Sequence, residues 1–173
     1  DVSVSQPGIS LVGVPATLAA GFESGNLSAA LGASQHGGVT VRIAVSEKMI
    51  AKKVTPFSTK HHPVPTVSVR FEAGGRSLVY SADTGPGGGF PALGFGADVM
   101  VCEATLQGER TPFDYEYHLT SAEAGSLARR ADVGRLILTH VSPTLDTERS
   151  ISEAAATYGT EPELAVPGLE IQV

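Results

Sequence analysis

The sequence has few of the features that mark secreted and membrane proteins. Its 173 residues contain one cysteine, Cys102, and no tryptophan. A single cysteine cannot form a disulfide within the chain, so the cysteine count gives no support to a secreted protein. No uncharged apolar run approaches the roughly 18 residues that a membrane-spanning helix needs, and the first residues lack the basic and apolar regions of a signal peptide. These absences predict a cytoplasmic protein with no membrane partner.

Positive charge is also scarce. The chain has 12 Lys and Arg against 18 Asp and Glu, a formal net charge of −6. Sequence-independent binding of nucleic acid depends on neutralising phosphates, so the bulk charge argues against it. A local cluster of lysines could still steer a phosphate-bearing substrate, although a solvated strand face is the more common explanation. The cluster comprises Lys48, Lys52, Lys53 and Lys60.

The length predicts about one compact domain, and its first half favours strands. Residues 1–38 have weak patterns, which predict a short strand over Ile9–Val14 and a helix that Pro15 begins over Ala16–Phe22. A Gly74-Gly75 pair between two later apolar runs favours a β-hairpin. β-branched and aromatic residues predict strands over Val39–Val45, Ile50–Ser58, Thr66–Glu72 and Ser77–Ala82.

The second half alternates between short apolar runs and helical patterns, which predicts an α/β domain with a mixed sheet. Thr120 and Glu123 form a capping-box pattern at the start of one helix, and Gly159 ends another. The expected elements are strands over Asp98–Glu103 and Arg135–Thr139, helices over Ser121–Ala131 and Thr147–Tyr158, and closing strands over Glu163–Val166 and Leu169–Val173 around the Pro167-Gly168 turn.

Several apolar strands run into a titratable residue. Asp83, Glu103 and His140 each stand at or just after the end of such a run, and His118 precedes a helix. Ligands of open α/β sheets bind outside the carboxyl ends of the strands, so these side chains are expected to converge. Taken singly, each has a simpler explanation: Asp83 as an Asx-turn residue, Glu103 as a buried carboxylate that binds backbone amides, and each histidine as a structural residue.

Taken together, the same residues favour metal chemistry. Imidazole nitrogens and carboxylates from separate strand ends are the ligands of zinc and di-metal hydrolases, where two ions clamp the attacking and leaving oxygens. The chain has no compact metal signature of the Cys-x-x-Cys or His-Glu-x-x-His kind, so spacing alone leaves the metal site as a hypothesis.

Five ordered motifs over about residues 39–173 resemble the metallo-β-lactamase-fold hydrolases, in particular the ribonuclease Z-like phosphodiesterases. The motifs are His62-Pro63-Val64-Pro65, Ser81-Ala82-Asp83-Thr84, Cys102-Glu103-Ala104-Thr105, His118-Leu119-Thr120-Ser121 and Leu138-Thr139-His140. The resemblance implies an αββα sandwich of two sheets with helices on both outer faces. It also implies that residues 1–173 form one such domain, incomplete on its N-terminal side.

The resemblance also implies roles for individual residues. His62 corresponds to a metal ligand, Asp83 to the carboxylate that bridges two metals, and His140 to the last ligand of the second metal. His118 corresponds to the histidine that assists the leaving group, with Glu103 as its acidic partner. The implied cofactor is a pair of zinc ions, or manganese or another divalent ion. The implied substrate is a phosphodiester of RNA or a nucleotide, and relatives of this kind often form homodimers.

The chain departs from the family pattern at three points. Ala82 stands where the family usually has glycine before the bridging Asp83, and only 21 positions separate His62 from Asp83, too few for the arm that holds tRNA. The shorter interval favours a smaller phosphodiester over tRNA 3′-end processing. His61 is one residue from the family position, and strand alternation predicts that it lies on the opposite face.

The third departure is the family's His-x-His-x-Asp-His motif, which supplies the remaining ligands and is absent from these 173 residues. We expect the sequence to be the C-terminal part of a longer hydrolase, so that these residues alone bind zinc weakly and catalyse little. The alternatives are a hydrolase of another ester or thioester on the same fold, and a metal-free binding module.

Overall fold

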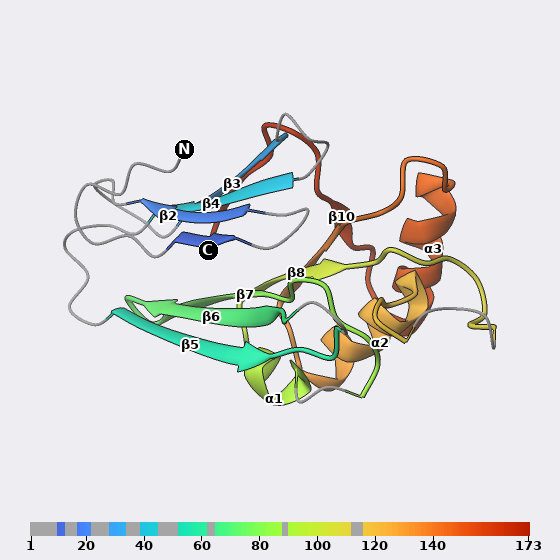
Figure 1. Cartoon of the computed structure of the whole chain (residues 1–173), viewed down its shortest axis with the longest axis horizontal. Coiled ribbons are helices and arrows are strands. Elements are labelled where there is room, and N and C mark those ends of the chain that lie inside the picture. Colours follow the sequence, from blue (N-terminus) through green and yellow to red (C-terminus); the bar gives the residue numbers. More distant parts are fainter. Residues whose placement is uncertain are drawn as a thin grey trace.

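The computed structural model describes residues 10–12, 17–21, 28–33, 39–44, 52–61, 65–87, 90–111 and 116–173. Within these residues, two β-sheets lie one above the other and the helices gather beside the second sheet (Figure 1). The first sheet has the strand order β1-β2-β4-β3-β11, and the second has the order β10-β9-β8-β7-β6-β5. The expected α/β sandwich is therefore confirmed.

The first sheet contains a strand where the sequence predicted a helix. Its strands are β1 (Ser10–Val12), β2 (Thr17–Gly21), β3 (Ser28–Ala33), β4 (Val39–Ala44) and β11 (Glu170–Gln172). The helix predicted over Ala16–Phe22 is wrong, because β2 pairs antiparallel with β1 and parallel with β4. Leu18, Ala19 and Ala20 favour a helix as isolated residues, but pairing with the two neighbouring strands overrides this preference. The strand expected over Ile9–Val14 is confirmed as β1.

The second sheet follows the sequence patterns closely. Its strands are β5 (Lys52–Ser58), β6 (Val67–Ala73), β7 (Arg76–Tyr80), β8 (Val99–Glu103), β9 (Arg135–Thr139) and β10 (Glu163–Leu164). The expected hairpin joins β6 to β7, and Gly74 and Gly75 both have positive φ, at 59° and 78°. Strands β7 to β10 run parallel, so their carboxyl ends meet at one edge.

Side chains alternate between the two faces of the central strands. Leu78, Val101 and Ile137 belong to one buried cluster, which Ile171 of β11 joins from the first sheet. Val79, Met100, Cys102, Leu136 and Leu138 belong to a second cluster, packed against the helices. Because both faces are buried, the strands read as continuous apolar runs in the sequence.

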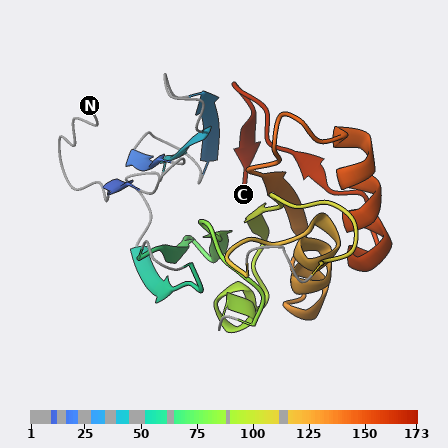
Figure 2. The same ribbon diagram turned by 45° about the vertical axis from the view of Figure 1, so that its right-hand side comes forward.

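Three helices pack on the second sheet: α1 (Phe90–Gly94), α2 (Ser121–Arg130) and α3 (Thr147–Tyr158). Turned by 45°, the molecule shows them on the side of that sheet away from the blue strands (Figure 2). The Thr120–Glu123 capping box at the start of α2 is confirmed, as is the left-handed Gly159 that ends α3. Within the described residues the helices cover one outer face, whereas the resemblance implied helices on both.

The two closing strands belong to different sheets. β10 extends the second sheet parallel to β9, whereas β11 pairs antiparallel with β3 in the first sheet. The Pro167-Gly168 turn therefore carries the chain between the sheets.

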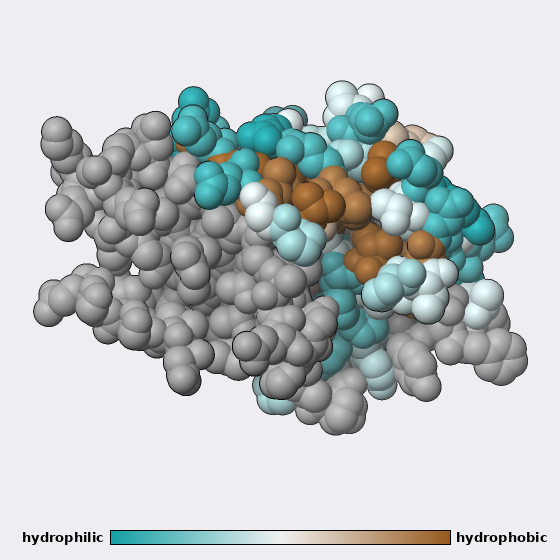
Figure 3. Space-filling model, turned by 90° about the horizontal axis from the view of Figure 1, so that it is seen from above, coloured by the Kyte–Doolittle hydropathy of each residue, from teal (hydrophilic) through white to brown (hydrophobic). Residues whose placement is uncertain are grey.

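Seen from above, the described part of the surface has a band of hydrophobic side chains bordered by hydrophilic ones (Figure 3). None of the helices in the described ranges has the length and apolar character that crossing a bilayer requires.

Close packing of α2 on α3 depends on Gly125. A Cβ at this position would overlap the Ala154 carbonyl and the Thr157 hydroxyl, both of which belong to α3. We predict that Gly125→Ala forces the helices apart and lowers the free energy of unfolding by about 1–3 kcal/mol. Urea denaturation measures the change. Ser152→Ala, on the exposed surface of α3, is the control and should stay within about 0.5 kcal/mol of the parent. Equal stability of the two variants would contradict the prediction.

Candidate active site

The carboxyl edge of the second sheet gathers the titratable residues that the sequence singled out. Asp83 lies just beyond β7, Glu103 ends β8, and His140 follows β9. The preceding Ala82 and His140 itself are non-glycine residues with positive φ, at 51° and 58°. Left-handed backbone is costly for such residues and clusters at functional sites, so these two turns mark the edge as a candidate site.

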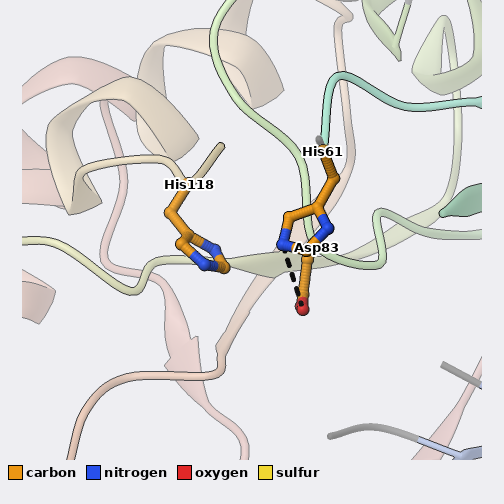
Figure 4. Close-up of side chains that lie close together, drawn as sticks. All are labelled: His61, Asp83 and His118. Carbon is orange, nitrogen blue, oxygen red and sulfur yellow. Dashed lines mark ion pairs between the residues drawn. The ribbon is translucent and has the colours of Figure 1, made fainter. Parts of the chain in front are cut away.

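Asp83 lies at the centre of this edge. It is buried, with 6% of its surface exposed. Its Oδ1 lies 3.2 Å from His140 Nδ1, and its Oδ2 lies 3.9 Å from His61 Nε2 (Figure 4). Burial raises the pKa of the Asp83 carboxyl; the charge of His140 opposes this and that of Glu103 adds to it. The surroundings of Asp83 therefore favour an added positive charge, either a proton or a cation.

Glu103 is the most buried of the carboxylates at this edge, with 1% of its surface exposed. Its Oε1 accepts a hydrogen bond from the Thr84 amide at 2.8 Å and lies 3.1 Å from His118 Nδ1. Its Oε2 accepts from the Thr105 hydroxyl at 2.7 Å and from the Thr105 and Leu119 amides, each at 3.2 Å. Both explanations of Glu103 therefore hold together: it binds backbone amides and also pairs with His118.

His118 is half-buried and is oriented from two sides. Its Nδ1 contacts Glu103, and this hydrogen bond raises the pKa of His118 against the opposing effect of burial. Its backbone carbonyl accepts a hydrogen bond from Arg110, which also forms a two-pronged ion pair with Glu123. Glu123 in turn completes the capping box of α2 with Thr120. The helix that follows His118 therefore anchors its backbone.

His61 lies on the same side as Asp83, so the prediction that it lies on the opposite face is wrong. β5 ends at Ser58, so strand alternation no longer governs residue 61. A Thr59 hydroxyl bond to the Asp83 carbonyl, 2.8 Å long, and a Gly85 amide bond to the Lys60 carbonyl hold this segment against the Asp83 loop. His61 therefore lies beside Asp83, with its ring 5.1 Å from that of His118 in an edge-to-face arrangement. His62, the residue that the resemblance favoured, lies outside the described residues.

Two groups of side chains in the described part of the chain could hold a metal ion. One comprises His61, Asp83 and His118, and the other comprises Glu103, His118 and His140. In each group the ligand atoms lie within 4.8 Å of one another. Nitrogen and carboxylate oxygen are ligands that zinc accepts. Asp83 of the first group lies 3.2 Å from His140 of the second, so the two groups adjoin.

Gly85 allows the loop before His118 to approach the loop that carries Asp83. A Cβ on Gly85 would overlap the backbone carbonyl of Glu116. Lys60 closes the same contact, with its ammonium 2.6 Å from the Glu116 carboxylate. This contact brings His61 and His118 to the same side of Asp83.

The two lysines of the cluster whose side chains are described are both paired with glutamates. Lys60 is paired with Glu116, and Lys53 lies 3.3 Å from the Glu72 carboxylate. Lys48 lies outside the described residues. For Lys53 and Lys60, these pairs favour the explanation of a solvated face over that of a patch that steers phosphate.

Comparison with known proteins identifies the family. A sequence model described as "Beta-lactamase superfamily domain" matches residues 5–141. An uncharacterised protein of Mycobacterium leprae (strain TN) is 40% identical over 110 residues, which cover 62% of this chain and 38% of that protein. Ribonuclease Z of Shouchella clausii (strain KSM-K16) is 48% identical over 69 residues, 39% of this chain and 22% of that enzyme.

A solved structure agrees with these sequence relatives. The metallo-β-lactamase-fold protein YhfI of Bacillus subtilis superposes with a TM-score of 0.65 at 25% identity, over 78% of this chain and 56% of that one. The chain thus spans less than half the length of the two curated relatives and little more than half that of YhfI.

The Glu103 contact leads to a prediction about His118. In the metal-free chain we expect the imidazole pKa to lie above the usual value of about 6.5, and Glu103→Gln to lower it. Because the folded pKa is the higher one, the protonated pair stabilises the fold at pH values below about 6.5, and this contribution is lost as the pH rises through the folded pKa. NMR titration of the His118 ring with a chelator present measures the pKa. The same pKa in parent and variant would contradict the expectation.

Proposed function

The chain belongs to the β-lactamase superfamily domain family, and from this premise we propose that the protein is a metal-dependent hydrolase of phosphodiesters in RNA or nucleotides. The observation that carries the proposal is the contact of His118 with the buried Glu103, beside Asp83 and His140. When protonated, an imidazole held by a carboxylate can act as a general acid, which a leaving alkoxide needs.

The donor set fits the metal that the family implies. Asp83 and His61 in one group, and His140 in the other, offer carboxylate and imidazole ligands that zinc and manganese both accept. The resemblance adds His62 as a ligand. A bound divalent ion supplies Lewis acidity and lowers the pKa of a water ligand. Asp83 is the residue proposed to bridge two such ions, because it lies between His61 and His140.

The proposed role of His118 is at the leaving oxygen of the scissile bond. Its Nδ1 hydrogen goes to Glu103, which leaves Nε2 to carry the proton that passes to the leaving oxygen. The raised pKa of His118 keeps this proton in place to a higher pH than an exposed histidine would. Glu103 holds the ring in one orientation, because four further hydrogen bonds fix the carboxylate itself.

Two other functions remain as alternatives. The leaving group of a thioester or an activated ester departs without a proton from an acid. A hydrolase of such esters would therefore not need His118. A metal-free binding module would need neither His118 nor Asp83. Ribonuclease Z is the name of one curated relative, which favours the phosphodiester over both alternatives.

Removing His118 tests the proposed role. The test uses the natural full-length protein loaded with zinc or manganese. We predict that His118→Ala lowers its kcat about 10²–10⁴-fold on RNA or nucleotide phosphodiesters. The loss should be much smaller on a bis(p-nitrophenyl) phosphate, because nitrophenolate leaves without a proton. Arg149→Ala, which removes only an exposed ion pair on α3, is the control. Equal losses on both substrates would exclude the general-acid role, and full activity of His118→Ala would favour the thioester alternative.

Zinc titration tests the ligand set of the 173 residues themselves. With the His-x-His-x-Asp-His motif absent, we predict weak binding of zinc, which Asp83→Asn should weaken further because Asp83 contacts both His61 and His140. Competition with a chromophoric chelator measures the affinity. A larger loss for His62→Ala than for His61→Ala identifies His62 as the ligand, and the reverse identifies His61. Two tight sites on the chain would contradict the prediction.

A further inference from the structure

Thr105 occupies a junction between the two halves of the site. It lies two residues beyond the end of β8 and is half-buried. Its Oγ1 lies 2.7 Å from Glu103 Oε2, 2.9 Å from His140 Nδ1 and 3.4 Å from His118 Nδ1. One hydroxyl thus contacts the buried carboxylate and two of the histidines that the proposed chemistry uses, His118 and His140.

The hydrogen count at this hydroxyl has one solution. A threonine hydroxyl has a single hydrogen and two lone pairs, and an ionised carboxylate can only accept. The shortest contact is the one to Glu103, where the charge strengthens the bond, so the hydroxyl hydrogen goes to Glu103. The contact to His140 at 2.9 Å is then a hydrogen bond only if His140 Nδ1 carries the hydrogen and Thr105 accepts it.

The surroundings hold the hydroxyl in this role. Glu103 cannot turn away, because the amides of Thr84 and Leu119 bind its two oxygens, and the Thr105 amide binds Oε2 as well. Asp83 Oδ1 also faces His140 Nδ1, at the longer distance of 3.2 Å, and as an acceptor it requires the same hydrogen on Nδ1.

From this geometry we propose that Thr105 is a positioning residue that keeps the hydrogen of His140 on Nδ1 and leaves the lone pair of Nε2 for the metal. The proposal rests on the proposed function in one respect, which is that His140 is a metal ligand. When Asp83 ligates the ions, the Thr105 hydroxyl remains the partner of Nδ1. A hydrogen-bond partner behind a ligating histidine raises metal affinity, and its loss typically costs about 10–100-fold.

Two substitutions separate the hydroxyl from the shape of the side chain. Thr105→Val keeps the volume and removes the hydroxyl, whereas Thr105→Ser keeps the hydroxyl. Long-range 15N–1H NMR spectra of the histidine rings, recorded on the neutral, metal-free chain, report which nitrogen carries the hydrogen. We expect His140 to hold it on Nδ1 in the parent and in Thr105→Ser, and to shift towards the Nε2-H form in Thr105→Val. Zinc affinity should fall about 10–100-fold in Thr105→Val and be retained in Thr105→Ser.

Thr157→Val is the matched control, because that hydroxyl bonds only to carbonyls in and beside α3. It should lower stability without moving the His140 hydrogen or the zinc affinity. An unchanged His140 ring in Thr105→Val would overturn the proposal, even if zinc binding weakened. If Thr105→Val does not fold, the NMR spectrum of the parent chain is a sufficient test. A hydrogen on Nε2 of His140 in that spectrum would overturn the proposal. Neither the NMR spectra nor the zinc affinity depends on hydrolysis. Failure of the His118→Ala test would therefore contradict the proposed function without contradicting the role of Thr105.

Discussion

The buried charge of Glu103 is the constraint on which the rest of the site depends. Moving a carboxylate out of water costs several kcal/mol unless hydrogen bonds replace its hydration. Here the donors come from three separate segments, carrying Thr84, Thr105 and His118-Leu119. Among the described residues, no buried side-chain nitrogen or oxygen lacks a hydrogen-bond partner. Any displacement of one loop leaves part of this charge unsatisfied, so the carboxylate forces the loops into a single arrangement.

The backbone conformation at the strand ends then orients Asp83 and His140. Ala82 and His140 both adopt positive φ, a conformation that costs roughly 1–2 kcal/mol for a residue with a side chain. Ala82 does so at the position where the resemblance leads one to expect glycine, the residue that adopts positive φ without a steric penalty. The Ser81 hydroxyl accepts a bond from the Glu103 amide, and the Ser68 hydroxyl donates to the Ser81 carbonyl. These bonds tie the turn before Asp83 to the neighbouring strands and offset its strain.

Features governed by local chemistry were readable from the sequence, and those governed by contacts between distant segments were not. The Gly74-Gly75 hairpin and the Thr120 capping box depend on neighbours in sequence, and both are confirmed. The residues of β2 favour a helix, but its pairing with two partner strands determines its structure. The convergence of Asp83 with His140 followed from parallel strands, whereas the role of Thr105 depends on atoms brought from three segments, a coincidence that no sequence pattern records.

The pKa values of Asp83 and His118 are both raised. Asp83 and Glu103 are two buried carboxylates whose charges repel, and the pKa of Asp83 is raised by burial and by that repulsion. The pKa of His118 is raised by its bond to Glu103. Both shifts mean that this edge of the sheet stabilises added positive charge. A proton satisfies that preference at low pH, and near neutral pH a divalent cation does so without protonating the carboxylates it binds. The surroundings of Asp83 and His118 therefore favour added positive charge at this edge of the sheet.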